Sequence, residues 1–143
     1  MKIAIINGPN LNLLGTREPE VYGSYTLKEL EEMLKQAVSG KNVNMVFFQS
    51  NSEGEIVDFI HSMIGNADGI IINPGAYSHY SIAILDALRA FPGRVIEVHL
   101  SNVFRREEYR KRLLTAEAAD AVIAGLGFES YLFALFYLMD SIQ

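Results

Sequence analysis

The sequence contains no cysteine, which excludes disulfide bonds, a thiolate nucleophile and zinc sites built on cysteine. It also lacks any run of about 18 apolar residues, the length that crosses a membrane. The first apolar run, residues 3–6, is followed at once by Asn-Gly-Pro-Asn, a pattern that does not fit a secretory signal. These absences predict a soluble protein of the cytoplasm.

An excess of positive charge is also missing, because the formal net charge is -5. A general nucleic-acid binder needs a basic surface, so this class is disfavoured. An anionic small molecule remains compatible, since a few arginines reverse the field inside a cleft. No Gly-x-Gly-x-x-Gly or Walker-type loop is present, which disfavours a nucleotide enzyme. No grouping of His, Asp and Glu has metal-ligand spacing, so no metal site is expected.

What is present is the composition of one globular domain, which we place at residues 1–143, with half of the residues hydrophobic. Short, nearly continuous apolar runs predict buried strands at residues 3–6, 43–48, 69–72, 94–99 and 121–124. Helical patterns follow at residues 27–39, 55–65, 81–91, 106–113 and 129–142. This alternation predicts an α/β fold, a flavodoxin-like, doubly wound five-stranded parallel sheet with helices on both faces.

The last predicted helix, residues 129–142, is apolar on nearly every side. Such a helix is typically buried all round. We expect one of its faces to cover the sheet and the other to meet a second subunit.

Polar side chains are concentrated after the predicted strands, whereas the segments before the strands are plain. Because carboxyl ends of parallel strands share one edge of a sheet, these groups are expected to form one site. Taken singly, Asn-Gly-Pro-Asn could be only a turn, and His99 only a core histidine. The groups that follow the four strands are Asn7, Asn10, Asn12, Arg17 and Tyr22; residues 49–53; residues 73–79; and residues 99–102 with Arg105, Arg106 and Arg110.

Tyrosine, histidine and arginine are the groups left for acid-base chemistry. A free tyrosine has a pKa of about 10, but a neighbouring arginine favours the phenolate. Arg17 and Tyr22 share one loop, so their pairing is plausible. Histidine suits proton donation, and amides can hold a developing oxyanion. The set favours proton abstraction beside a carbonyl, followed by loss of a protonated leaving group.

Six motifs follow one another along essentially the whole chain: Ile-Asn-Gly-Pro-Asn-Leu-Asn-Leu-Leu-Gly at 6–15, Arg-Glu-Pro-Glu-Val-Tyr-Gly at 17–23, Gln-Ser-Asn-Ser-Glu-Gly at 49–54, Asn-Pro-Gly-Ala-Tyr-Ser-His at 73–79, Glu-Val-His-Leu-Ser-Asn at 97–102 and Arg-Glu-Glu-Tyr-Arg at 106–110. Together they resemble the motifs of the type II 3-dehydroquinate dehydratase family. The resemblance implies a flavodoxin-like fold and a homododecamer built as four trimers. It implies conversion of 3-dehydroquinate to 3-dehydroshikimate in the shikimate pathway, through an enolate and with no cofactor.

By this resemblance, Tyr22 is the base that removes the proton next to the ketone. Arg17 lowers its pKa and stabilises the transition state. Asn10 helps to hold a water against the enolate oxygen. His99 protonates the departing hydroxyl, with Glu97 as its partner. The first loop would then act as a catalytic lid.

The resemblance also implies which residues bind the substrate. The backbone at Leu100 and Ser101 and the Ser101 hydroxyl are expected to hold the carboxylate. Asp86 is expected to reach the site of a neighbouring subunit. The full set is Asn73, His79, Asp86, Leu100, Ser101 and Arg110.

Some positions depart from the usual family pattern, namely Tyr80, residues 103–105, residues 111–114 and Ser130. Two alternatives stay open: a flavodoxin-like module that binds flavin or another phosphorylated ligand, and a catalytically silent assembly subunit. A phosphate binder needs a Gly/Ser/Thr-rich turn running straight into a helix. The first loop here is long and carries Arg17 and Tyr22 instead.

Overall fold

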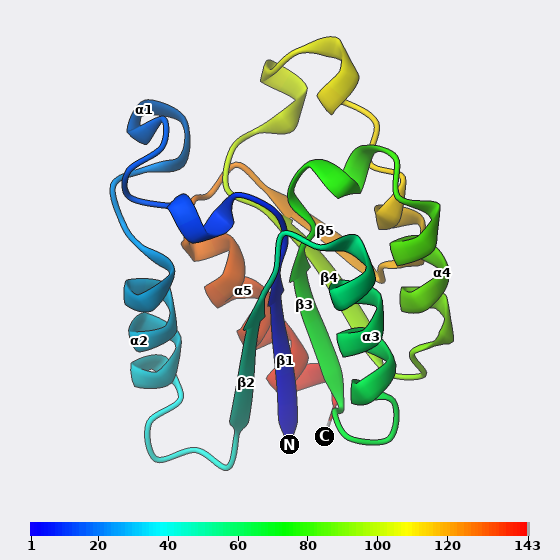
Figure 1. The fold of residues 1–143 in the computed structure, drawn as a ribbon. Coiled ribbons are helices and arrows are strands. Elements are labelled where there is room, and N and C mark those ends of the chain that lie inside the picture. The colour runs from blue at the N-terminus through cyan, green and yellow to red at the C-terminus, as the bar shows by residue number, and fades with distance from the viewer. Residues whose placement is uncertain (143) are drawn as a thin grey trace.

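Five parallel strands form a single sheet in the computed structural model, which describes residues 1–142 (Figure 1). Their order is β2-β1-β3-β4-β5, so the predicted flavodoxin-like sheet is confirmed. Each predicted strand is present, and its ends agree with the prediction to within one residue. The strands are β1 (Lys2–Asn7), β2 (Asn44–Gln49), β3 (Gly69–Asn73), β4 (Arg94–His99) and β5 (Ala121–Ala124).

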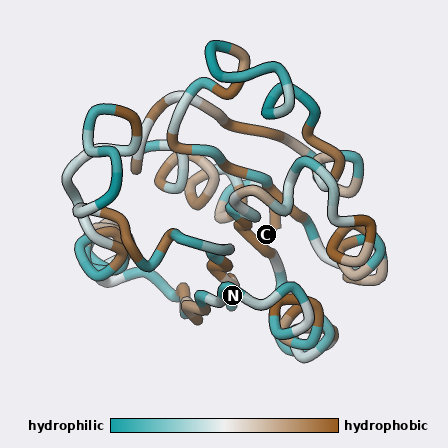
Figure 2. The backbone as a smooth tube through the Cα atoms, turned by 45° about the horizontal axis from the view of Figure 1, so that its top comes forward, coloured by the Kyte–Doolittle hydropathy of each residue, from teal (hydrophilic) through white to brown (hydrophobic). Residues whose placement is uncertain are grey.

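Helices cover both faces of the sheet (Figure 1). On one face lie α2 (Leu27–Ala37) and α5 (Glu129–Ser141), packed on Ile3, Ile5 and Ile71 among others. On the other face α3 (Glu53–Met63) and α4 (Ile82–Ala90) pack on Ala4 and Ile6. Alternate residues of a strand point to opposite faces, which is why two buried layers require continuous apolar runs. In Figure 2 the strands between the helices carry the hydrophobic colouring.

Side-chain caps fix where three of these helices begin. Thr26 and Glu29 form a reciprocal capping box at the start of α2. Ser52 accepts a hydrogen bond from the Glu55 N–H at the start of α3, and Ser81 accepts one from the Ile84 N–H at the start of α4. These caps start α3 and α4 on the side of the sheet where the strands end.

Of the two faces predicted for helix α5, the one that covers the sheet is confirmed. Tyr131, Leu135 and Leu138 are fully buried against the sheet. Phe133 and Tyr137 are 49% and 47% exposed, so the outer face is apolar but open to solvent in the single chain. No helix within residues 1–142 is both long enough and apolar enough to cross a membrane.

The prediction of a helix at residues 106–113 is wrong. Within this range the chain forms one short 3-10 turn, η4 (Glu108–Arg110), and extended backbone at Arg106 and Glu107 separates it from the preceding turn η3 (Val103–Arg105). A helix of this length needs an apolar stripe to pack, and this segment offers solvent mainly charges and Tyr109, which is 66% exposed. The turns η1 (Leu11–Leu13), η2 (Gly75–His79) and η5 (Thr115–Ala118) and the short α1 (Pro19–Tyr22) were not predicted.

Candidate active site

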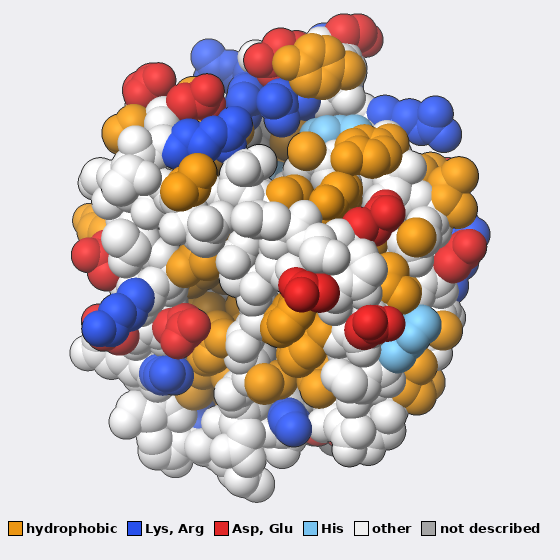
Figure 3. Space-filling model, in the orientation of Figure 1, with side chains coloured by type: hydrophobic (Ala, Val, Ile, Leu, Met, Phe, Trp, Pro, Cys, Tyr) orange, Lys and Arg blue, Asp and Glu red, His pale blue; other side chains and the backbone are white. Residues whose placement is uncertain are grey.

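A cavity of about 180 Å³ opens at the carboxyl edge of the sheet, where the loops after β1, β3 and β4 converge. Figure 3 shows Lys and Arg side chains gathered over this end of the molecule, next to a histidine. Nine of the ten residues assigned above to catalysis or substrate binding line this cavity, and Asp86 does not. The nine are Asn10, Arg17, Tyr22, Asn73, His79, His99, Leu100, Ser101 and Arg110. Asn12, residues 49–53 and Arg105, which were expected at the same edge, are not part of the cavity lining.

Asp86 lies elsewhere, on the exposed side of α4. The cavity of the chain that carries it therefore does not use this carboxylate. Its position is compatible with the expectation that it serves a neighbouring subunit.

Tyr22 ends helix α1 and faces two arginines. The guanidinium carbons of Arg17 and Arg106 lie 5.4 and 5.3 Å from the centre of its ring. Arg106 Nη2 also donates a hydrogen bond to the Tyr22 hydroxyl, at 3.2 Å. Both guanidiniums therefore place positive charge next to the Tyr22 side chain. Gly23 then ends the helix at a φ of 86°, a left-handed conformation that favours glycine.

Arg106 is a site residue that the sequence analysis left without a role. Its Nη1 donates to Ser101 Oγ at 3.1 Å, so one guanidinium joins the loop after β4 to the loop after β1. The residue lines the cavity, and its side chain is only 16% exposed. The motif at residues 106–110 could have indicated a role for Arg106, because it places Arg106 and Arg110 four residues apart. The extended backbone at position 106 could not be anticipated from that spacing.

Arg110 lies beside Tyr22 and is paired with Glu107. Its Nε donates to Glu107 Oε2 at 2.8 Å. Burial alone would lower the pKa of Arg110, but the charges of Tyr22 and Glu107 outweigh burial and raise it. The pKa of Glu107 is lowered, first by a hydrogen bond to its own backbone and then by Arg110 and Arg106. Arg110 therefore stays a cation at the cavity wall.

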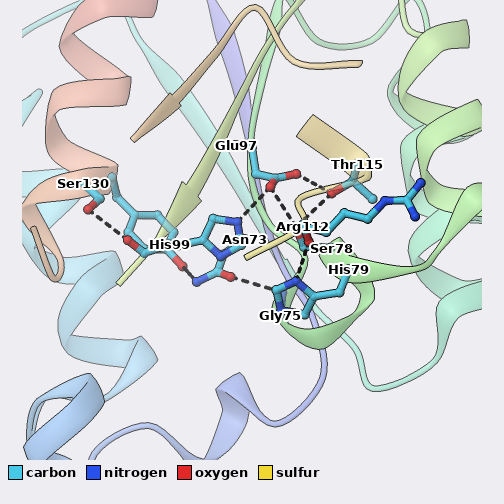
Figure 4. Close-up of polar contacts among 10 residues, drawn as sticks. Asn73, Gly75, Ser78, His79, Glu97, His99, Arg112, Thr115 and Ser130 are labelled. Atoms are coloured by element: carbon cyan, nitrogen blue, oxygen red, sulfur yellow. Dashed lines mark hydrogen bonds and ion pairs between the residues drawn. The ribbon is translucent and has the colours of Figure 1, made fainter. Parts of the chain in front are cut away.

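His99 lies at the end of β4 and is backed by a buried carboxylate (Figure 4). His99 Nε2 is 2.8 Å from Glu97 Oε2, and the Glu97 side chain is fully buried. Ser78 Oγ donates to the same carboxylate at 2.9 Å, and Thr115 Oγ1 donates to its other oxygen. An ionised carboxylate only accepts, so Nε2 donates to Glu97 and Nδ1 is left for the cavity.

The Asn73 side chain is oriented by two hydrogen bonds. Its Nδ2 donates to the Tyr131 hydroxyl at 3.1 Å, and its Oδ1 accepts from the Gly75 N–H at 3.1 Å. Tyr131 donates in turn to Asn7 Oδ1 at 2.5 Å. Burial raises the pKa of Tyr131 well above its usual range, so the phenol stays protonated and can donate. This buried network fixes which end of the Asn73 amide faces the cavity.

His79 comes from turn η2, and its orientation is set by the backbone (Figure 4). Its Nδ1 lies 2.8 Å from the carbonyl oxygen of Arg112. A carbonyl only accepts, so Nδ1 carries the proton and Nε2 is the nitrogen that can contact a ligand.

Among the residues that the structure describes, no three His, Asp or Glu side chains are close enough to hold a metal ion. The cavity instead combines a tyrosine under positive charge with a histidine backed by a carboxylate. A flavodoxin-like fold with such a pair in a cavity at its carboxyl edge has the arrangement of an α/β enzyme suited to acid-base chemistry on a small molecule.

Comparison with known proteins identifies the family. The family described as Dehydroquinase class II matches residues 1–139. The 3-dehydroquinate dehydratase of Carboxydothermus hydrogenoformans is 50% identical over 143 residues, which cover 100% of this chain and 93% of the relative. That of Bartonella henselae is 52% identical over 139 residues, or 97% of this chain and 94% of the relative. The chain belongs to the class II dehydroquinase family.

The solved structures agree with this assignment. The type II dehydroquinase of Butyrivibrio crossotus superimposes with a TM-score of 0.94 and 45% sequence identity, covering 97% of each chain. The resemblance drawn from the motifs is therefore confirmed. After β1 the chain forms a long loop that carries Arg17 and Tyr22, and not a phosphate-binding turn that runs straight into a helix.

Proposed function

We propose that this protein is a hydro-lyase that removes water from 3-dehydroquinate to give 3-dehydroshikimate. This reaction belongs to the shikimate pathway, which leads to chorismate and the aromatic amino acids. Membership of the family and the names of its close relatives support the assignment. The observation that carries it is the pairing, in one cavity, of Tyr22 under two guanidiniums with His99 backed by buried Glu97.

Tyr22 is the proposed base. Its phenolate takes a proton from the carbon next to the substrate ketone, and the electrons of that bond form an enolate. The positions of Arg106, 3.2 Å from the hydroxyl, and of Arg17 over the ring support this role, because they place positive charge beside the group that takes the proton. Asn10 lines the cavity and is proposed to hold a water against the enolate oxygen.

His99 is the proposed acid of the second step. When the enolate collapses, the carbon–oxygen bond to the leaving hydroxyl breaks, and His99 gives that oxygen a proton so that it departs as water. The Glu97 contact at Nε2 supports this role, because it fixes the ring and leaves Nδ1 for the cavity. Proton transfer from Tyr22 back to His99 through solvent restores the starting state.

The remaining cavity residues are proposed to orient the substrate. Ser101 Oγ accepts from Arg106, so its own O–H is available for the substrate carboxylate, together with the backbone at Leu100 and Ser101. Asn73, His79 and Arg110 are proposed to bind substrate hydroxyls. No cofactor enters the proposed mechanism.

We also propose that the working unit is a trimer, assembled four times into a dodecamer. In this arrangement Asp86 reaches the cavity of a neighbouring subunit. The exposed position of Asp86 supports this, as do the large exposed apolar side chains on α5 and near the cavity mouth. The apolar side chains include Tyr80, Phe104, Tyr109, Phe133 and Tyr137. The location in the cytoplasm and the single domain remain predictions.

The test of the proposed reaction is the ultraviolet absorbance of the conjugated enone after addition of 3-dehydroquinate to purified protein. Before this assay, one sample of enzyme mixed with substrate is treated with borohydride and desalted. A second sample, without borohydride, is handled in parallel, and 3-dehydroquinate is then added to both. An equal rise in both samples is expected, because no imine forms. No rise in either sample would contradict the proposal and would favour a catalytically silent subunit.

A further inference from the structure

We propose that Asn51 is a positioning residue for the dehydration, because its side chain holds the backbone of Asn10 in the conformation that the cavity needs. This inference rests on the role proposed above for Asn10. Asn51 belongs to the motif at residues 49–54, in which Ser52 caps α3 and the Asn51 side chain is outside both the helix cap and the mechanism described above. It does not line the cavity, so it acts through another residue.

The contact is a hydrogen bond between two loops. The Asn10 N–H, after β1, donates to Asn51 Oδ1, after β2, at 3.0 Å. Gln49 Nε2 donates to the same Oδ1 and to the Gly8 carbonyl, both at 3.2 Å. The amide oxygen of Asn51 thus accepts two hydrogen bonds and links the loop after β2 to the start of the loop after β1.

Asn10 needs such support because its backbone is unusual. Its φ is 68°, in the left-handed region that side chains other than glycine seldom adopt. Asparagine tolerates this region better than most residues, yet the conformation persists only where the surroundings impose it. The Asn10 carbonyl is held by the Leu13 N–H at 3.0 Å, and Asn51 holds the other side of the residue.

The segment just before Asn10 is fixed in a different way, by close packing. A Cβ atom on Gly8 would lie 2.3 Å from the Pro74 carbonyl oxygen, so the loops after β1 and β3 touch directly there. Asn10 lies two residues further on and is exposed, where packing no longer dictates the backbone. At Asn10, the hydrogen bond to Asn51 holds the backbone in place of packing.

Asn51 also contacts the third loop of the cavity. Its backbone carbonyl accepts a hydrogen bond from the Tyr77 hydroxyl at 2.7 Å. Tyr77 belongs to turn η2, which carries His79 into the cavity. Asn51 therefore sets the relative position of Asn10 and the η2 wall from outside the cavity.

The proposal predicts that the acceptor oxygen of Asn51 is what matters. Asn51→Ala removes it, whereas Asn51→Asp keeps an oxygen that accepts from both Asn10 and Gln49. Asn51→Leu keeps the branched shape without the acceptor and serves if the alanine variant does not fold. Asn66→Ala is the matched control, because Asn66 is an exposed asparagine whose amide bonds the Ser62 carbonyl at the opposite edge of the sheet.

The measurement is kcat and KM for 3-dehydroquinate, with the urea midpoint of each variant, for these proteins and for Asn10→Ala. We expect kcat of Asn51→Ala and Asn51→Leu to fall by about tenfold to a hundredfold with KM little changed, the size of loss that a small misplacement causes. Asn51→Asp should recover most of kcat, and Asn66→Ala should match the wild type in kcat.

Two results would overturn the inference about Asn51 and leave the proposed reaction intact. The first is a loss of kcat in Asn10→Ala together with full kcat in folded Asn51→Leu. The second is a kcat in Asn51→Asp that is as low as in Asn51→Leu. Full kcat in Asn10→Ala overturns the proposed role of Asn10 and the inference with it. The wild-type rate tests the proposed reaction separately.

Discussion

The two sides of the cavity are built in different ways. His99 is 6% exposed and Glu97 is fully buried, and hydroxyl groups from two other segments hold the carboxylate. Tyr22 is half-buried on a helix of four residues, held by arginines that come from loops. The side with the proposed acid, His99, is thus positioned by the core, and the side with the proposed base, Tyr22, by contacts with charged groups. Damage to the acid side should cost stability as well as activity, whereas damage to the base side should cost mainly activity.

The largest effect in this comparison is expected for Glu97→Gln. The amide removes the charge behind His99 and places an N–H₂ group among hydroxyl donors. We expect kcat to fall by about a hundredfold, within the range that general acid catalysis contributes. The free energy of unfolding should fall by about 1–3 kcal/mol, the cost of an unsatisfied buried group.

Steady-state kinetics and urea denaturation of the Glu97 variant check both values. Glu53→Gln is the control, because Glu53 also accepts a serine hydroxyl at this edge, from Ser81 at 2.5 Å, but touches no histidine. Unchanged stability of Glu97→Gln would remove the distinction between the two sides.

The next effect is expected for Arg106→Met, which removes a cation from Tyr22 and leaves Arg17 in place. A hydrogen bond to a charged group contributes about 1.5–3 kcal/mol, so kcat/KM should fall by about tenfold or more. The urea midpoint should stay near that of the wild type, since the guanidinium lies at the cavity wall. Arg105→Met changes the exposed neighbour and should retain activity. Equal losses in both variants would point to general charge and not to the contact with Tyr22.

A smaller effect on activity is expected for Tyr131→Phe. The change leaves the buried Asn7 and Asn73 amides without their shared partner, so the free energy of unfolding should fall by about 1–3 kcal/mol. KM should rise because the Asn73 amide loses its fixed orientation, while kcat should change less. Tyr137→Phe, on the exposed face of α5, is the control for denaturation and kinetics. A rise in KM without loss of stability would contradict the buried network.

The smallest effect is expected for Glu107→Gln and depends on pH. The pKa of Glu107 is lowered in the folded chain, so its ionised form adds stability above the unfolded value of about 4.5. This contribution is lost as pH falls through the lower folded value. The difference in Tm between wild type and variant should therefore be present at neutral pH and vanish in acid. A difference that persists at the lowest pH would show that charge is not its cause.

Much of the fold could be predicted because its signals are local. Runs such as residues 69–72, buried on both faces, leave few alternatives to a central parallel strand. The helix at residues 106–113 was predicted as one member of the strand-helix alternation, but this segment has no apolar stripe to pack, and the prediction was wrong.

The candidate site could be predicted from topology, because strand ends gather at one edge. Contacts between distant segments could not. Arg106 reaches Tyr22 across 84 positions, and Tyr131 reaches Asn7 across 124. Thr115, which holds Glu97, lies in a turn with no motif of its own. The proposed role of Asp86 depends on a second copy of the chain, whose position a single sequence does not give.

The most direct test of the proposed division of labour is hydrogen exchange at the substrate carbon next to the ketone, followed by NMR in D₂O. In the proposed mechanism, Tyr22 removes that proton without His99, which acts only on the leaving hydroxyl. His99→Asn should therefore exchange this hydrogen while forming little product, and Tyr22→Phe should neither exchange nor dehydrate. Exchange at the wild-type rate in Tyr22→Phe, or its absence in folded His99→Asn, would contradict the account.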